Sequence, residues 1–99
     1  MEITRTKNDN TEVIGLIGRL DVITSPKLQT ALLEVVKTAE NIELDFAEVD
    51  YVASAGLRVL LHVLKIVQKD NKSMVLKNVS AEVTEVFDVT GFLGILTIV

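Results

Sequence analysis

The sequence predicts an α/β fold: a single domain over residues 1–99, with a mixed sheet of four to five strands, an antiparallel N-terminal hairpin and about three helices. Two observations predict it. Two β-rich segments open the chain, separated by residues that favour a tight turn. Segments with helical spacing then alternate with short strand-like segments. No glycine-rich, proline-rich or repeated stretch divides these 99 residues.

The N-terminal hairpin is expected from residues 3–7 and 12–17, which are rich in β-branched side chains. Asn8, Asp9 and Asn10 lie between them, and these residue types tolerate the left-handed backbone of a tight turn. The two segments should therefore pair antiparallel.

The first helix is expected at residues 26–39. Thr24 and Ser25 offer a capping hydroxyl, and Pro26 suits the first helical position. Apolar residues then recur at helical spacing up to Ala39.

A strand over residues 42–46 follows, because apolar and acidic residues alternate there. Residues 47–53 are expected to form a loop. From Leu57 to Val67 nearly every residue is apolar, which predicts a central, well-buried second helix. The polar positions of that helix form one narrow stripe: Arg58, His62, Lys65 and Lys69.

The C-terminal part is expected to contain a strand over residues 73–77, a third helix and a final strand over residues 95–98. Ser80 should cap the third helix and Gly91 should stop it. The order of these elements predicts helical crossovers between parallel strands after the hairpin.

Composition excludes several classes of function. Apolar residues make up 48% of the chain and charged residues 24%, with a net charge of -4, so no basic face for nucleic acid is expected. No stretch has the length of a signal peptide or membrane span, which predicts a cytoplasmic protein that does not bind membranes. With no cysteine and one histidine, neither a metal nor another cofactor is expected.

Ser54 follows the predicted loop, in a position similar to that of a hydrolase nucleophile. The glycine that such a turn needs two residues earlier is Val52 here. The single histidine, His62, would lie two helical turns away, at about 12 Å. A serine hydrolase is therefore not expected, and the chain is predicted not to be an enzyme.

Two other sites are weighed and rejected. Asp45, Glu48 and Asp50 could suggest a magnesium site or a receiver domain, but no acidic pair follows the first strand. These acids are expected to form a solvated face. Residues 15–19 lack the lysine and spacing of a phosphate-binding loop.

Ser54 and Arg58 have structural and functional interpretations. Ser54 should act as the N-cap of the second helix, which stabilises a protein by about 1 kcal/mol. Arg58 is poorly placed for the helix dipole, so it could serve a partner's carboxylate, a nearby phosphate or solvent alone.

Several segments, taken in order, resemble the STAS domains of bacterial anti-sigma factor antagonists. They are Gly18-Arg19-Leu20-Asp21, then residues 42–52, then Ala53-Ser54-Ala55-Gly56-Leu57, and finally Phe87 to Phe92. The likeness covers nearly the whole chain.

The resemblance implies a regulatory binding protein without catalytic activity. Unphosphorylated, such a protein binds an anti-sigma factor serine kinase and frees a sigma factor; phosphorylation of a serine, here Ser54, ends the interaction, and a PP2C-type phosphatase restores it. No obligate small molecule is implied. Ala55 and Gly56 would keep the docking surface flat. That surface is expected to include Asp21, Thr24, Ala53, Ala55, Gly56 and Arg58.

The sequence departs from the family pattern beside the serine. Ala53 replaces a common aspartate and Arg58 replaces a glycine, while Arg19 replaces a glutamate near Asp21. The alternative interpretation is therefore a constitutive, unphosphorylated STAS scaffold or a ligand-sensing module in a signalling complex.

Overall fold

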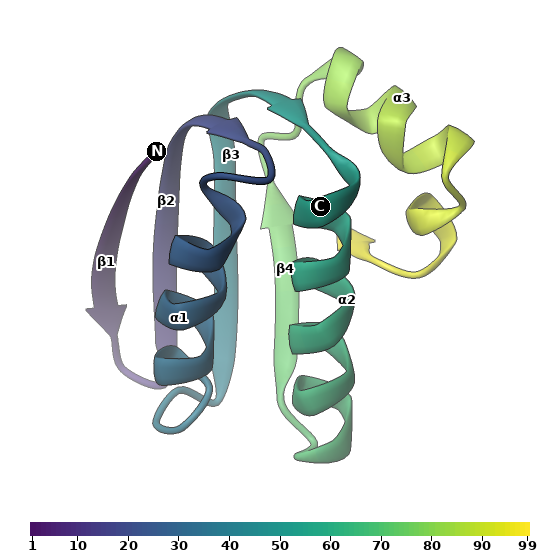
Figure 1. Cartoon of the computed structure of the whole chain (residues 1–99). Helices are drawn as coiled ribbons and strands as arrows, with labels where there is room; N and C mark the ends of the chain where they lie inside the picture. The colour runs from purple at the N-terminus through teal and green to yellow at the C-terminus, as the bar shows by residue number, and fades with distance from the viewer.

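The molecule is built on a five-stranded mixed sheet, which the computed structural model describes for all residues 1–99 (Figure 1). The strands lie in chain order. The first pair is antiparallel and the remaining pairs are parallel, which confirms the predicted fold class. The strands are β1 (Glu2–Asn8), β2 (Thr11–Leu20), β3 (Asn41–Val52), β4 (Ser73–Lys77) and β5 (Thr97–Ile98).

The opening hairpin forms as the sequence predicts. Asn8 pairs with Thr11, so Asp9 and Asn10 form a two-residue connection. Asp9 has a positive φ of 58°, the left-handed conformation that aspartate tolerates better than most residues.

Three helices and one short 3-10 turn connect the parallel strands. α1 (Ser25–Val35) and α2 (Ser54–Lys69) lie side by side against one face of the sheet (Figure 1). α3 (Ala81–Val89) lies beyond the upper end of the sheet and is followed by η1 (Phe92–Gly94). Ser80 caps α3, since its Oγ accepts a hydrogen bond from the Val83 amide at 3.2 Å.

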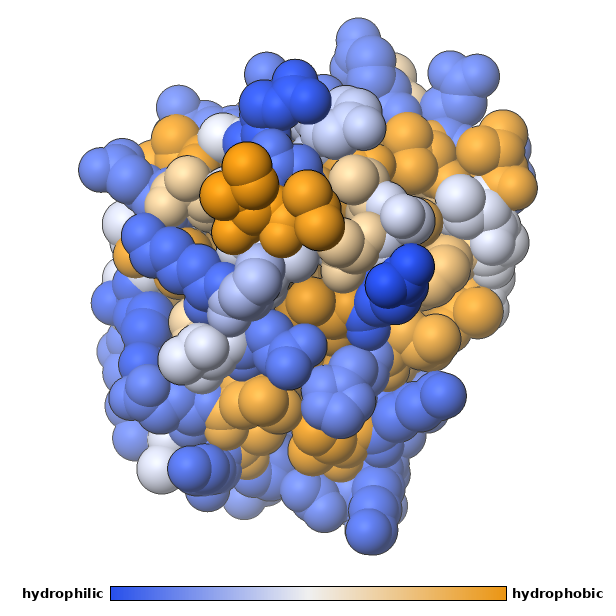
Figure 2. Space-filling model, in the orientation of Figure 1, coloured by the Kyte–Doolittle hydropathy of each residue, from blue (hydrophilic) through white to orange (hydrophobic).

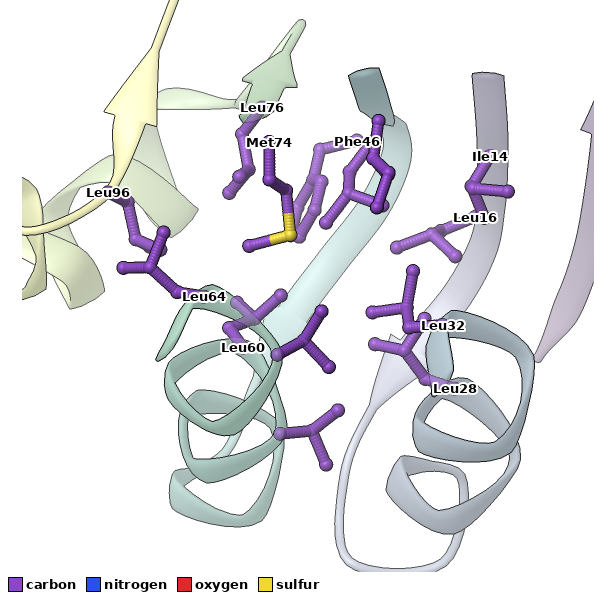
Figure 3. Close-up of a cluster of buried hydrophobic side chains, with 14 of the residues drawn as sticks. Ile14, Leu16, Leu28, Leu32, Phe46, Leu60, Leu64, Met74, Leu76 and Leu96 are labelled. Atoms are coloured by element: carbon purple, nitrogen blue, oxygen red, sulfur yellow. The ribbon is translucent and has the colours of Figure 1, made fainter. Parts of the chain in front are cut away.

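The core lies between the sheet and the two long helices (Figure 3). In the first half of β3 every second residue points into it: Ile42, Leu44 and Phe46 are all fully buried. α3 joins this core through Phe87, whose ring meets that of Phe46 edge to face at a centroid distance of 6.2 Å.

The expectation that residues 47–53 form a loop was wrong, because β3 continues to Val52. Its pairing with β2 shifts register twice, between Gly15 and Ile17 and again between Gly18 and Arg19. Each shift accommodates one extra residue in β3, which breaks the alternation of apolar and polar positions. The strand therefore reaches far enough to end directly at α2.

Two other boundaries differ from the prediction. α1 ends at Val35 instead of residue 39; Ala39 is nevertheless buried, which is why its spacing looked helical. The last strand contains only Thr97–Ile98 instead of residues 95–98.

Candidate functional site

Ser54 is the first residue of α2 and is exposed to solvent. The prediction that it caps the helix was wrong. Ala53 occupies the N-cap position, with an extended backbone (φ -95°, ψ 171°), and no side chain caps this helix. The Ser54 hydroxyl is therefore not committed to a structural hydrogen bond, and it remains available for chemistry.

The loop between β2 and α1 is ordered around the Asp21 carboxylate. Its Oδ1 accepts hydrogen bonds from the amides of Ile23 and Thr24, each at 3.0 Å. The Thr24 hydroxyl accepts from the Asp21 amide at 2.9 Å and donates to the Arg19 carbonyl at 2.7 Å. This network fixes the loop in one conformation.

The network also keeps Asp21 ionised. The pKa of its carboxyl is lowered, first by the backbone amide of Thr24, and further by the Thr24 side chain, the Ile23 amide and the charge of Arg19. Arg19 Nε lies 3.8 Å from the carboxylate, and its guanidinium stacks 4.2 Å from the centre of the Tyr51 ring. A negative charge is thus held in place in the loop that follows β2.

The expectation that Thr24 or Ser25 caps α1 through its hydroxyl was wrong. Thr24 is the N-cap residue but makes no side-chain cap bond, and the buried Ser25 donates its hydroxyl to the Asp21 carbonyl. The Asp21 carboxylate instead accepts hydrogen bonds from the amides of Ile23 and Thr24, directly before the helix, and so takes the role of the capping group.

A main-chain hydrogen bond joins the end of β2 to the residue that follows β3. The amide of Ala53 donates a hydrogen bond to the carbonyl of Leu20 at 2.8 Å. Asp21 directly follows Leu20 in the chain, and Ser54 directly follows Ala53. β2 and β3 are parallel neighbours, and their carboxyl ends therefore open at the same edge of the sheet. This topology brings the segment that begins with Asp21 and the start of α2 to the same edge of the sheet.

Gly56 has a different role from the expected one. It is buried, and a Cβ built on it would lie 2.5 Å from Cγ of Leu20. Because Gly56 has no side chain, α2 can approach β2 closely. The expectation that this glycine keeps a docking surface flat was wrong, because Gly56 is buried.

The other predicted docking residues differ in exposure. Arg58 is exposed, whereas Ala53 and Ala55 are partly buried, as are Asp21 and Thr24. None of the three surface hollows, of about 130, 510 and 420 Å³, is lined by any of these residues or by Ser54. The site is a surface, which suits a macromolecular partner better than a small ligand.

Two apolar residues of this surface were missed by the sequence reasoning. Val22 is 72% exposed and Ile23 is 83% exposed, and both lie inside the ordered loop after Asp21. Figure 2 shows a protruding hydrophobic patch over this loop. Adjacent apolar side chains held outward by a fixed turn are typical of an interaction surface. The signal in the sequence was an apolar pair directly after a turn-forming aspartate.

The acidic residues Asp45, Glu48 and Asp50 have different surroundings in the structure. Asp45 accepts hydrogen bonds from the amide of Ala47 at 3.0 Å and from the Asn78 side chain at 3.1 Å. Glu48 and Asp50 are exposed, and the chain contains no group of three potential metal ligands. No helix has both the length and the apolar character required to cross a bilayer.

Comparison with known proteins assigns this arrangement to a family. The family model described as "Mlab, STAS domain" matches residues 3–97. The chain belongs to the STAS domain family. This result confirms the resemblance on which the site residues were chosen.

Individual STAS relatives are similar over nearly their whole length. The anti-sigma-B factor antagonist of Bacillus subtilis is 29% identical over 92 residues, covering 93% of this chain and 84% of that protein. The anti-sigma-B factor antagonist of Listeria monocytogenes is 32% identical over 100 residues, covering 99% of this chain and 86% of that protein. The chain is thus a STAS protein of the anti-sigma factor antagonist family.

Solved STAS structures share the fold at low sequence identity. The anti-sigma factor antagonist SpoIIAA in its unphosphorylated form matches with a TM-score of 0.84 and 19% identity, over 99% of this chain and 88% of that one. A Bacillus SpoIIAA in its phosphorylated form matches with a TM-score of 0.77 and 18% identity, over 99% and 91% of the two chains.

Proposed function

We propose that this STAS protein binds an anti-sigma factor kinase while Ser54 is unphosphorylated and thereby releases a sigma factor. Phosphorylation of Ser54 by that kinase would end the interaction, and a PP2C-type phosphatase would restore it. The observation that carries the proposal is the exposed Ser54, whose hydroxyl does not cap α2 and which follows the residue bonded to the start of the Asp21 loop. A Bacillus SpoIIAA of the same fold has been solved in a phosphorylated form, so a protein of this fold can carry a phosphate.

The proposed reaction transfers the γ-phosphoryl group of ATP to Oγ of Ser54. The serine O–P bond forms as the bond to the ADP leaving group breaks, and the hydroxyl proton is lost. The product carries about -1.5 to -2 charges at pH 7. At the start of a helix those charges meet free amides and the positive end of the dipole, so the fold should tolerate them.

A docked partner would not tolerate them equally. It would cover a dianion next to the ionised Asp21 carboxylate, at a surface where water is excluded. A coupling free energy of about 1–3 kcal/mol, typical of such switches, corresponds to a roughly 5- to 150-fold loss of affinity. The apolar pair Val22 and Ile23 supplies contact area that does not depend on phosphorylation.

The first test is capture of partners from host lysate with wild type, Ser54→Ala and Ser54→Asp. An ATPase related to histidine kinases should be retained by the first two and lost with the third. Ser73→Asp is the matched control, because Ser73 is an exposed serine at the start of β4, at the other end of the sheet. Equal recovery of that ATPase by wild type and Ser54→Asp would contradict the switch.

The alternative function is a constitutive STAS scaffold, favoured by Ala53 where the family pattern commonly has an aspartate. Intact mass spectrometry of the protein from native cells separates the two. A population heavier by one phosphate group, and absent in Ser54→Ala, supports the switch. A single unmodified mass under all growth conditions supports the scaffold.

A further inference from the structure

The outward face of α2 carries only basic and neutral side chains. Ser54, Arg58, His62, Lys65 and Lys69 are all exposed and follow one another at spacings of three or four residues, which places them along one stripe of the helix. α2 contains none of the fourteen acidic residues of the chain. Figure 2 shows hydrophilic side chains interspersed with hydrophobic ones on the surface over this helix.

Arg58 has no acidic partner. The ion pairs of the protein involve Arg5, Arg19 and Lys77, and none includes a residue of α2. A cation so near the positive end of the helix dipole does not stabilise the helix. Folding therefore gives no reason for an arginine at this position.

Ser54 and Arg58 are four residues apart on the same exposed face. At this spacing Cβ atoms lie about 5–6 Å from each other, within reach of a guanidinium group. An arginine fork donates two parallel hydrogen bonds to phosphate oxygens, which lysine cannot do.

We propose that Arg58 is the internal counter-charge for a phosphate on Ser54, binding its oxygens within α2. The inference rests on the proposed function, since it assigns a role to Arg58 in the phosphorylated state. Phosphorylation then changes the surface twice: it adds negative charge at Ser54, and it withdraws the arginine side chain from the partner. In the unphosphorylated state the same guanidinium is free to meet a carboxylate of the partner.

The test uses protein with phosphoserine installed at position 54 during translation, so it does not depend on any kinase. The second pKa of the phosphate, about 6 for phosphoserine, is measured by ³¹P NMR titration. Wild type should show a value lower by about 0.2 to 0.4 pH unit than Arg58→Gln, because the arginine favours the dianion. Arg58→Lys should recover part of the shift.

Neighbouring charges are controlled by further variants. His62 is an ionisable side chain on the same stripe, so the comparison is repeated in His62→Gln. Asp21 and Arg19 remain unchanged in all variants and contribute equally. Lys65→Gln removes a cation that lies about 16 Å along the helix from Ser54, and it should leave the phosphate pKa unchanged.

Equal phosphate pKa values in wild type and Arg58→Gln would overturn the role of Arg58. So would a rise of the phosphate pKa in Lys65→Gln as large as the rise in Arg58→Gln. That result would leave the proposed switch intact, because the switch is tested by partner capture and by intact mass. Conversely, absence of phosphate in native cells would contradict the switch without altering the titration.

Discussion

At the scale of single residues, Asp21 links folding to the site. Its carboxylate accepts two main-chain hydrogen bonds, and its lowered pKa means that the folded state favours the ionised form. Stability from this group is fully present above its unfolded pKa and is lost as the pH falls through the folded value. The site should therefore be best ordered at neutral pH.

Asp21→Asn tests this linkage. We expect the variant to be less stable than wild type at pH 7, and the difference to disappear as the pH falls below the folded pKa of Asp21. Urea unfolding from pH 7 to strongly acidic pH measures it. Asp50→Asn, an exposed carboxylate with no hydrogen bond in the structure, is the control and should show no such trend. A difference that persists in acid would contradict the role of the charge.

Gly56 is the second residue whose role can be tested alone. Replacing a helical glycine with alanine usually stabilises a helix by up to about 1 kcal/mol. Here the new Cβ would lie 2.5 Å from Cγ and 2.8 Å from Cδ2 of Leu20, so Gly56→Ala should destabilise the protein by about 1–3 kcal/mol. Urea unfolding decides the sign. Gly94→Ala, whose Cβ meets nothing within 4 Å, should be nearly neutral.

At the scale of elements, the loop from β2 to α1 presents Val22 and Ile23. Ile23→Ser should weaken binding of the proposed partner, an anti-sigma factor kinase, by about tenfold, because an exposed apolar contact is lost. Its urea midpoint should remain that of wild type. Val89→Ser, 77% exposed in α3, is the matched control and should bind normally. Unchanged affinity of Ile23→Ser would exclude the loop from the interface.

The sequence predicted elements well where one periodicity dominates. The apolar run from Leu57 to Val67 could only be a buried helix, and it lies inside α2. β3 was cut short because its two register shifts interrupt the alternation that identifies a strand. Residue types alone do not reveal such shifts, since they depend on the partner strand. Ser54 was placed at the cap position because serine is a preferred N-cap residue, whereas the structure has Ala53 there.

At the scale of the whole molecule, the site exists because two parallel strands end together. Residues Asp21 and Ser54 are 33 positions apart, and only the pairing of β2 with β3 brings their loops to one edge. The family resemblance had already predicted that the loop of Asp21 lies near Ser54. Neither periodicity nor resemblance indicated the exposure of Ile23, because that depends on how the Asp21 carboxylate turns the chain.

The central claim is that a phosphate on Ser54 controls binding. The most direct measurement is calorimetric titration of the proposed partner, a purified anti-sigma factor kinase, with wild-type protein and with protein carrying phosphoserine at position 54. We predict affinity roughly 5- to 150-fold weaker for the phosphorylated form. Equal affinity of the two forms would contradict the account.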